Sequence, residues 1–465
     1  MSAQYAEKRK EKAVADYLNG ISVVQITQNV GVSRSTIYTW IRKHKANGFL
    51  KTVSTHKEAM NLKQKLAKLQ DIVSALKQVD CTTKASLHER LLAAELLYHG
   101  FQKSNRFVLD ECTLAAAQGL GGVLLNTTKC EKNGNLQEYF KLYDAITVRR
   151  GMWNRMTEFS QGFQTRGFYP ALSSFHDARR RLHDGESFFL TYDEAPKHNV
   201  IKTYSLCHIG IPLTTDRSAA NGVILTGNIP DGYTDEELTA FFGKAVIMDA
   251  DALRVLESRG LGHLAGVRWA GEASDAVMEH YNLEDPITDS LTDEFRDIRI
   301  AFFGQSAAIL EPLDGSVRTI SYLENYCGKR LGITSSLYRN ELGGRVCVLG
   351  YGAFARVESP SRKLLMMRIC DELTRYTMPV KVLDDCKAAV FIRSDESGTR
   401  SMVTFLNMSL DDTGDVRVAI RGASNIKLLA ADGSETELAV KLQDGYAVAS
   451  VPNTPAYDTR VLLAE

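Results

Sequence analysis

The sequence contains no apolar run that approaches the roughly 18 residues of a membrane-spanning helix. Its first residues, MSAQYAEKRKEK, are polar and charged and lack the apolar core of a secretory signal. We therefore expect a cytoplasmic, reduced and soluble protein that has no membrane partner.

Patterns that bind metal ions or cofactors are also missing. The eight cysteines form no CxxC pair, and the pair Cys207-His208 is the one place where a cysteine has a neighbouring histidine. Adjacent residues do not easily chelate one metal ion, so we interpret this pair as structural. The glycines at 119–122 match neither GxGxxG nor a phosphate-binding loop. We expect no metal ion and no cofactor.

Charge is balanced over the whole chain but not along it. Residues 1–70 contain thirteen Lys and Arg against four Asp and Glu, a net charge of +9, so the other 395 residues carry −9. This asymmetry is typical of a nucleic-acid-binding end attached to a mildly acidic remainder.

The stretch ISVVQITQNVGVSRSTIYTWIRKHK, residues 21–45, has the spacing of a helix-turn-helix. A preceding helix ends at Gly20, a second helix begins at Ser22, and Gly31 supplies the tight turn. The third helix follows Ser33 and turns Thr36, Ile37 and Trp40 or Ile41 inward. We predict that this third helix is the recognition helix.

The outward residues of the third helix have the chemistry of a DNA interface. Arg34 and Ser35 lie in its first turn, Tyr38 and Thr39 follow one turn later, and Arg42, Lys43 and Lys45 lie where phosphates would run. The predicted DNA-binding set is Ser33, Arg34, Ser35, Tyr38, Thr39, Arg42, Lys43 and Lys45. The alternative is a small three-helix bundle with a merely solvated basic face.

Residues 59–76 have a heptad pattern. The predicted dimerisation seam consists of Leu62, Leu66, Leu69, Val73 and Leu76, with Ala59 extending it. An ordinary amphipathic helix packed on its own chain has the same pattern, and the sequence leaves both interpretations open. A further helix is predicted over SLHERLLAAELLYHG, where Ser86 and Glu89 form a capping box and Gly100 ends the helix.

The order of helix-turn-helix, leucine seam and SLHERLLAAELLYHG resembles the N-terminal region of insertion-sequence transposases, over roughly residues 8–100. In that family the region binds terminal repeats of the element and dimerises. The family's chemistry requires an RNase H-like domain with three metal-binding carboxylates, and we find no matching arrangement downstream. The resemblance therefore implies DNA binding without strand transfer.

From about residue 105 strand and helix patterns alternate. They include GVLLN, NGVILTGN, KAVIMDADALRVLESRGLG, IRIAFFG, GRVCVLGYG and the helix SRKLLMMRICDELTRYT. Such alternation predicts an α/β layer with a largely parallel sheet. Seven short strand patterns, from AAVFIRS to TRVLLAE, then predict a β-sandwich over 385–465.

This succession, with LAAAQGLGGVLLN, IGIPLT, LTGNIPDGYTDEEL and GRVCVLGYG, resembles the C-terminal half of β-galactosidase-like bacterial glycoside hydrolases. Those enzymes combine a (β/α)₈ barrel, an amidotransferase-like α/β domain and a β-sandwich. The resemblance implies that Asp110–Asn126 is the last helix and strand of the barrel. A barrel takes about 250 residues, so most of it is absent here.

The catalytic prediction follows from that comparison. A retaining glycosidase needs two carboxylates about 5 Å apart on rigid strand ends. The pairs Asp110-Glu111 and Asp193-Glu194 are neighbours in sequence, and we interpret both as turn or helix-start residues. An amidotransferase needs Gly-x-Cys-x-Gly, whereas KAVIMDADAL has Asp249 at that place. We predict no catalytic residues.

The predicted fold is multidomain: an all-α helix-turn-helix arm, an α/β amidotransferase-like domain and a C-terminal β-sandwich. The predicted ranges are 1–50 for the helix-turn-helix, 51–104 for zipper-like and linker helices, 105–164 for the barrel remnant, 165–384 for the α/β domain and 385–465 for the sandwich. Double-stranded DNA is the predicted partner, with homo-oligomers through 59–76 or the C-terminal part. The alternative function is carbohydrate binding or processing.

Overall fold

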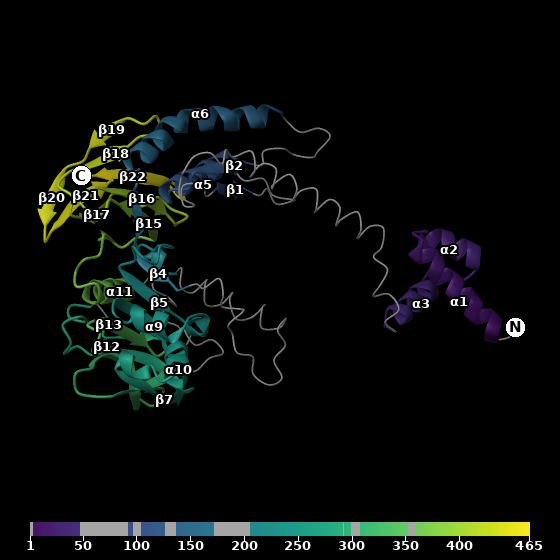
Figure 1. The fold of residues 1–465 in the computed structure, drawn as a ribbon, viewed down its shortest axis with the longest axis horizontal. Coiled ribbons are helices and arrows are strands. Elements are labelled where there is room, and N and C mark those ends of the chain that lie inside the picture. The colour runs from purple at the N-terminus through teal and green to yellow at the C-terminus, as the bar shows by residue number, and fades with distance from the viewer. Residues whose placement is uncertain are drawn as a thin grey trace. The chain divides into compact units, whose positions relative to one another are not determined.

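The computed structural model describes residues 3–46, 92–95, 104–125, 136–171, 205–291, 293–298, 307–351 and 359–465. The chain forms two compact units, Met1–Ser86 and Leu87–Glu465, and we call the second unit the body (Figure 1). The predicted dimerisation seam and the pair Asp193-Glu194 lie outside the described residues, as does the predicted strand IRIAFFG from residue 299 onward.

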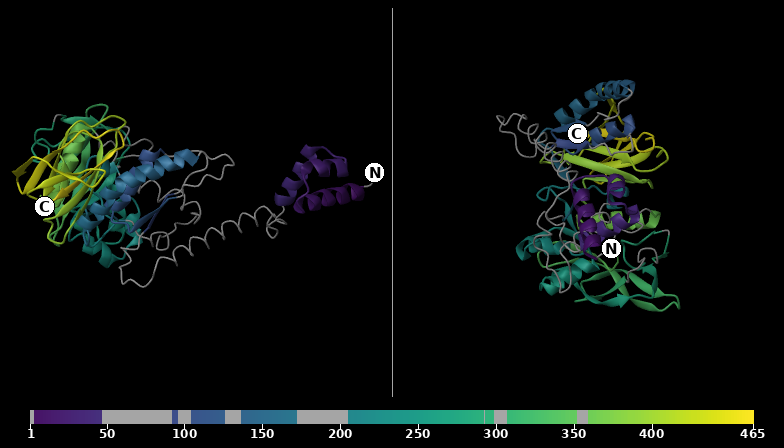
Figure 2. Two further views of the ribbon diagram at one scale, coloured as in Figure 1. Left: turned by 90° about the horizontal axis from the view of Figure 1, so that it is seen from above. Right: turned by 90° about the vertical axis from the view of Figure 1, so that its right-hand side faces the viewer.

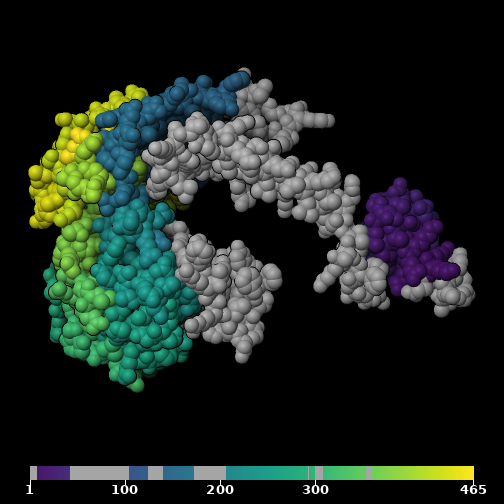
Figure 3. All heavy atoms as spheres, in the orientation of Figure 1, coloured from purple at the N-terminus to yellow at the C-terminus, as the bar shows by residue number. Residues whose placement is uncertain are grey.

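The described part of the first unit, residues 3–46, contains three helices, α1 (Ala3–Leu18), α2 (Val23–Val30) and α3 (Arg34–Ala46). Their shared core consists of Ala13, Ile26, Val30, Ile37 and Ile41. Gly20 and Gly31 both have positive φ, as the turns between these helices require. In Figure 3 the three helices form a small, closely packed purple group of atoms. The N-terminal region is therefore the helical helix-turn-helix that the sequence predicts.

The predicted helix over SLHERLLAAELLYHG is wrong at residues 92–95. These residues form strand β1 (Leu92–Glu95), which pairs in parallel with β2 (Gly122–Leu125). Helix α5 (Asn105–Ala117) connects the two strands, so the segment is a βαβ unit of the body. The helical periodicity of LLAAELL was misleading because short apolar runs suit helices and strands alike.

Helix α5 begins five residues before the predicted start, because the Ser104 hydroxyl caps it by accepting from the Phe107 amide. Asp110 is consequently a buried mid-helix residue, and its interpretation as a helix-start residue is wrong. Helix α6 (Leu136–Phe159) packs beside α5 and along the sandwich, and it lies beside the yellow strands in Figures 1 and 2.

A ten-stranded sheet forms the centre of the body. Its main path runs β4 (Phe168–Pro170), β5 (Gly222–Leu225), β6 (Ala245–Asp249), β13 (Arg345–Leu349), β12 (Arg330–Arg339), β11 (Arg318–Asn325), β8 (Ala276–Tyr281) and β9 (Phe295–Asp297), with β7 (Val267–Ala273) and β10 (Ala307–Pro312) attached through β12. Strands β4, β5, β6 and β13 are parallel. From β12 to β9 every pairing is antiparallel. The predicted largely parallel sheet is thus a mixed sheet.

The parallel strands are buried on both faces, which explains their continuous apolar runs. Alternate residues such as Val246 and Met248 pack against α9 (Asp235–Phe241) and α10 (Ala250–Ser258). Ile247 and its counterparts on β5 and β13 pack against α11 (Pro360–Leu373) on the other face. The result is a three-layer α/β arrangement around the parallel half of the sheet.

The C-terminal strands form the predicted β-sandwich. One sheet contains β14 (Val380–Val382), β17 (Val416–Arg421), β21 (Tyr446–Val451) and β20 (Val440–Gln443). The other contains β19 (Glu435–Glu437), β18 (Ile426–Leu429), β22 (Thr459–Ala464), β16 (Ser401–Asn407), β15 (Ala388–Ser394) and β3 (Gln164–Arg166). The sandwich therefore includes β3 and β14, which precede residue 385 in the chain.

No helix among the described residues is long and apolar enough to cross a membrane.

Candidate nucleic-acid interface and polar clusters of the body

The turn between α2 and α3 is built by its caps. The Ser22 hydroxyl accepts a hydrogen bond from the Gln25 amide at 3.3 Å and so begins α2. Gly31 ends α2 with φ of 69°, and its amide donates to the Thr27 carbonyl. The Ser33 hydroxyl then accepts from the Thr36 amide at 3.3 Å at the start of α3. These contacts fix the direction in which α3 leaves the turn.

Helix α3 has one buried and one exposed side. Ile37 and Ile41 are buried, and Trp40 is partly buried against the same core. The exposed side presents Arg34, Ser35, Tyr38 and Thr39. Thr36, expected inward, is half-buried. Four of the residues predicted to bind DNA, Arg34, Ser35, Tyr38 and Thr39, are therefore exposed together on the second helix of a helix-turn-helix.

Hydroxyl groups in the first turns of α3 also make hydrogen bonds within the helix. The Ser33 hydroxyl lies 2.8 Å from the hydroxyls of Ser35 and Thr36, and the Thr39 hydroxyl donates to the Ser35 carbonyl at 2.9 Å. Tyr38 is 54% exposed, a high value for an aromatic side chain. Arg42, Lys43 and Lys45 lie in the last turns of α3, and their side chains are outside what the structure describes.

A buried ionic cluster surrounds Glu279 on β8. The Glu279 carboxylate is completely buried and accepts from Arg296 Nε at 2.5 Å, from the Ser321 hydroxyl at 2.7 Å and from the Tyr351 hydroxyl at 2.7 Å. A second guanidinium, Arg362 on α11, is fully buried with Nη1 3.8 Å from the carboxylate. Both guanidiniums also lie over the Tyr351 ring, at 5.2 and 5.5 Å.

The cluster controls the ionisation of Glu279. Burial alone would raise the pKa of this carboxyl, but Arg296, Arg362 and the two hydroxyls lower the pKa to about 2. Glu279 is thus a fixed anion that neutralises buried arginines, which is a structural role and not that of a proton donor.

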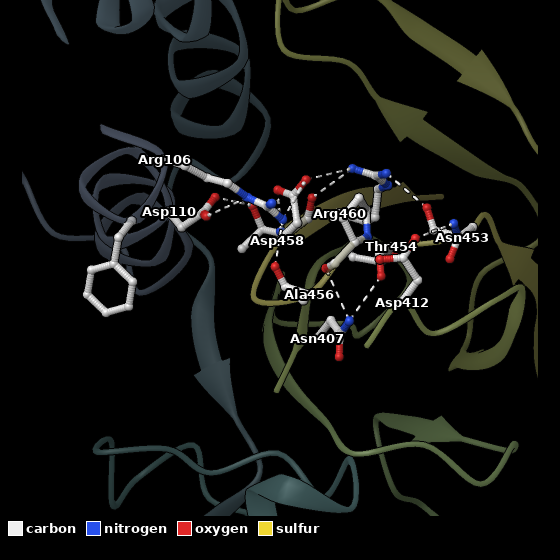
Figure 4. Close-up of polar contacts among 12 residues, drawn as sticks. Arg106, Asp110, Asn407, Asp412, Asn453, Thr454, Ala456, Asp458 and Arg460 are labelled. Atoms are coloured by element: carbon white, nitrogen blue, oxygen red, sulfur yellow. Dashed lines mark hydrogen bonds and ion pairs between the residues drawn. The ribbon is translucent and has the colours of Figure 1, made fainter. Parts of the chain in front are cut away.

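A second cluster joins α5 and α6 to the sandwich (Figure 4). Asp110 Oδ1 accepts from Arg149 Nη1 at 2.8 Å and lies 3.3 Å from the Thr459 hydroxyl. Asp458 lies between Arg106, Arg149 and Arg460, with nitrogen–oxygen distances of 3.4, 3.6 and 3.7 Å. Burial raises the pKa of Asp110 and Arg149 offsets part of that rise. Each carboxylate already has arginine partners, so the cluster fastens the βαβ unit to the sandwich.

Asp249, which the sequence analysis compares with the cysteine of an amidotransferase, caps a helix. Its carboxylate accepts from the Ala252 amide at 2.9 Å at the start of α10 and from the Gly227 amide at 2.9 Å. It therefore ties the ends of β5 and β6 together. Burial raises the pKa of the Cys207 thiol to about 11, which leaves it protonated and unreactive at neutral pH.

The sequence analysis missed Glu279, although the pattern of β8 contains a signal. Glu279 alternates with Val277 and Tyr281 on the buried side of the strand. An acidic residue in register with apolar neighbours indicates a buried, paired carboxylate. Its partners come from β9, β11, α11 and the residues after β13, and no local pattern indicates that these meet.

Within the described ranges no group of three or more His, Cys, Asp or Glu side chains is arranged to hold a metal ion. The polar clusters of the body are ion pairs with internal partners, whereas the exposed side of α3 faces solvent. The fold and sites thus define a helix-turn-helix domain attached to a β-rich α/β body.

Comparison with known proteins finds a similarity for each of the two parts. Residues 5–51 match a family model described as a homeodomain-like domain. A comparison of the sequence with curated proteins finds no match.

The body is similar to solved structures of glycoside hydrolases. Against α-L-fucosidase isoenzyme 2 from Paenibacillus thiaminolyticus the TM-score is 0.55 with 14% identity, covering 80% of this chain and 60% of that chain. Against β-galactosidase from Bacillus circulans sp. alkalophilus the TM-score is 0.47 with 10% identity, covering 78% and 52%. The chain thus spans less than two thirds of either enzyme, and at 14% identity the likeness to the fucosidase shows the fold alone.

Proposed function

We propose that this chain binds double-stranded DNA sequence-specifically by placing α3 in the major groove. One observation supports this most directly: α3 buries Ile37 and Ile41 while Arg34, Ser35, Tyr38 and Thr39 are exposed together. A helix-turn-helix domain reads DNA with this face of its second helix. The net charge of +9 over residues 1–70 adds attraction to phosphate.

The residues divide by role. Ser33 positions the start of α3, Arg34 and Ser35 contact base edges, and Tyr38 and Thr39 contact bases or sugars one turn later. Arg42, Lys43 and Lys45 contact phosphates, because the later turns of a recognition helix lie nearer the backbone.

The experiment is a binding selection on random duplexes with the full chain, followed by titration of the selected and a scrambled duplex. We expect one enriched motif, and an affinity for the scrambled duplex that falls steeply as salt increases. Enrichment of no motif over repeated rounds would contradict sequence-specific binding.

We further propose that the N-terminal unit is of the insertion-sequence transposase type, which the succession of the helix-turn-helix and the leucine seam supports, although the third motif of that resemblance contributes strand β1 to the body. The seam Leu62, Leu66, Leu69, Val73 and Leu76 would then hold a homodimer on DNA, and a helix packed on its own chain remains the alternative. The body would be catalytically incomplete, with an amidotransferase-like domain at 165–384, and the protein would work in the cytoplasm.

A second function, carbohydrate binding by the body, has one supporting observation. The body shares its fold with an enzyme named as an α-L-fucosidase, at a TM-score of 0.55. Folds do not transfer function by themselves, so this alternative depends on a cleft that suits a sugar.

A further inference from the structure

A cleft lies where the α/β part of the body meets the sandwich. Its volume is about 280 Å³, close to the lower end of the range for small-molecule sites, roughly 300–1,000 Å³. The 3₁₀-helix η2 (Ser205–His208), the first turn of α11, the loop 384–387 and the loop 408–413 form its walls. Its lining residues belong neither to the Glu279 cluster nor to α3, and the proposed DNA binding does not use them.

The buried lysine of the cleft already has hydrogen-bond partners within the protein. Lys363 on α11 is 6% exposed, and its ammonium donates to the carbonyls of Asp384 and Cys386. Ile209, buried beside η2, supplies an apolar wall. Burial raises the pKa of the Cys386 thiol, so this thiol does not act as a nucleophile at neutral pH.

The outer part of the cleft presents both hydrogen-bond donors and hydrogen-bond acceptors. The side chains of Asp385 and Lys387 are exposed and have no partner among the described residues. The Ser409 hydroxyl accepts from the Asp411 amide at 3.2 Å, and its own hydrogen has no acceptor in this part of the chain. In the same loop as Ser409, Asp412 Oδ2 accepts from the Asn453 side-chain Nδ2 at 3.2 Å (Figure 4).

The charges of the lining cancel. The two lysines of the lining, Lys363 and Lys387, balance its two carboxylates, Asp385 and Asp412. An anion or a cation would therefore gain no net attraction, and a zwitterion would gain little from rim charges that solvent screens. A hydroxyl group both donates and accepts, so an uncharged polyhydroxy ligand can donate to the carboxylates and accept from Lys387.

We propose that this cleft binds one uncharged polyhydroxy molecule of monosaccharide size. The proposal deepens the carbohydrate-binding alternative given above and rests on it for the choice of ligand. It does not depend on DNA binding by α3.

The test is calorimetric titration of the full chain with D-galactose, L-fucose and D-glucose, and separately with glycine and inorganic phosphate. We expect saturable binding of at least one of the three sugars at one site per chain, and none of glycine or phosphate. Absence of saturable sugar binding, or preference for glycine or phosphate, overturns the proposal.

Two variants place the site. Asp385→Asn and Lys387→Met should each weaken sugar binding at least tenfold, since each removes one ionic hydrogen-bonding partner of the ligand. The matched controls Asp444→Asn and Lys441→Met, exposed on or beside β20 and outside the cleft, should leave the affinity unchanged. Equal affinities in cleft and control variants, with unchanged melting temperatures, overturn this location.

The two proposals can fail separately. Arg34→Ala should leave sugar binding as it is, and Lys387→Met should leave DNA binding as it is. Sugar binding without DNA binding would contradict only the proposed function. DNA binding without sugar binding would contradict only this inference.

Discussion

At the residue scale, the arginine exposed on α3 and the arginines of the Glu279 cluster differ in what their charges face. Arg34 is exposed on α3, whereas Arg296 and Arg362 are turned inward toward Glu279. A charge in solvent is available to a partner, while a buried charge must be neutralised within the fold. Substitution of Arg34 should therefore change DNA recognition, whereas substitution within the Glu279 cluster should change the stability of the body.

Arg34→Ala should cost about 1–3 kcal/mol of binding to the selected duplex and relax the preference at one base position. Its guanidinium lies at the start of α3, where it can pair with guanine O6 and N7.

Arg42→Ala or Lys43→Ala should weaken binding to all duplexes alike and lower the salt slope by about one unit. Salt titrations against the selected and scrambled duplexes measure both. An unchanged ratio between these duplexes for Arg34→Ala would mean that α3 presents a different face to DNA.

Glu279→Gln should lower the free energy of unfolding of the body by about 3–5 kcal/mol, because it leaves two buried guanidiniums without their counter-charge. The matched control is Glu311→Gln, which removes a pair with Arg268 at 2.7 Å whose side chains are 50% and 61% exposed. That change should cost about 0–1 kcal/mol. Urea unfolding at pH 7 compares the two, and equal costs would contradict the importance of the buried cluster.

The same residue predicts a pH dependence. Its pKa is lowered from 4.5 to about 2 on folding, so the stabilisation is complete above pH 4.5 and is lost as the pH falls toward 2. The difference in unfolding free energy between wild type and Glu279→Gln should therefore be constant near neutral pH and shrink between pH 4.5 and 2. A difference that stays constant down to pH 2 would show that Glu279 is not the titrating group.

At the element scale, α3 has to satisfy packing and recognition with alternate residues. Ile37 is completely buried while Tyr38, its neighbour, is 54% exposed. Adjacent residues of the helix therefore lie on different faces, so substitutions at adjacent positions should have different consequences.

Ile37→Asp should unfold the helix-turn-helix and abolish binding to every duplex, because it places a charge in the core formed with Ile26 and Ile41. Tyr38→Ala is the matched control: it should keep the fold and alter affinity only at the DNA surface. Hydrogen exchange over residues 8–41 reports folding, and duplex titration reports binding. Retained amide protection in Ile37→Asp would show that the core is placed wrongly.

At the scale of the whole molecule, the chain consists of two units with separate cores. The first core consists of residues from α1, α2 and α3, and the body has its own clusters around the sheet and within the sandwich. The unit boundary at Ser86 and Leu87 precedes β1, so the βαβ unit belongs to the body.

Separate cores predict separate unfolding. Ile37→Asp should remove the transition of the first unit in calorimetry and leave the melting temperature of the body unchanged. Glu279→Gln should lower the melting temperature of the body and leave the transition of the first unit unchanged. A single transition that both variants shift together would mean that the two units unfold as one.

The body is also predicted to be catalytically silent. Its described carboxylates at Asp110, Asp249, Glu279 and Asp458 are engaged by arginines or amides and are not a free acid–nucleophile pair. Purified full-length protein should not hydrolyse aryl galactosides or fucosides above background. Turnover that disappears on substitution of one Glu or Asp would contradict this prediction.

The sequence by itself determined the elements whose signals are local. The caps at Ser22 and Gly31, the inward Ile37, the apolar strands of the sheet and the strands of the sandwich are all set by neighbours a few residues away. Periodicity and turn chemistry report such short-range preferences directly, and they placed the exposed face of α3 as well.

Tertiary structure alone decided the features that depend on distant partners. Residues 92–95 form a strand because β2 is beside them, although their sequence also suits a helix. The sheet is mixed because β12 returns antiparallel to β13, and strand direction leaves no mark on a short apolar run. Glu279 is ionised because Arg296 and Arg362 reach it from β9 and α11, and the cleft exists because η2, α11 and two sandwich loops converge. The free energies of strand pairing and of burying charges depend on residues that are far apart in the chain, so no short stretch of sequence reveals them.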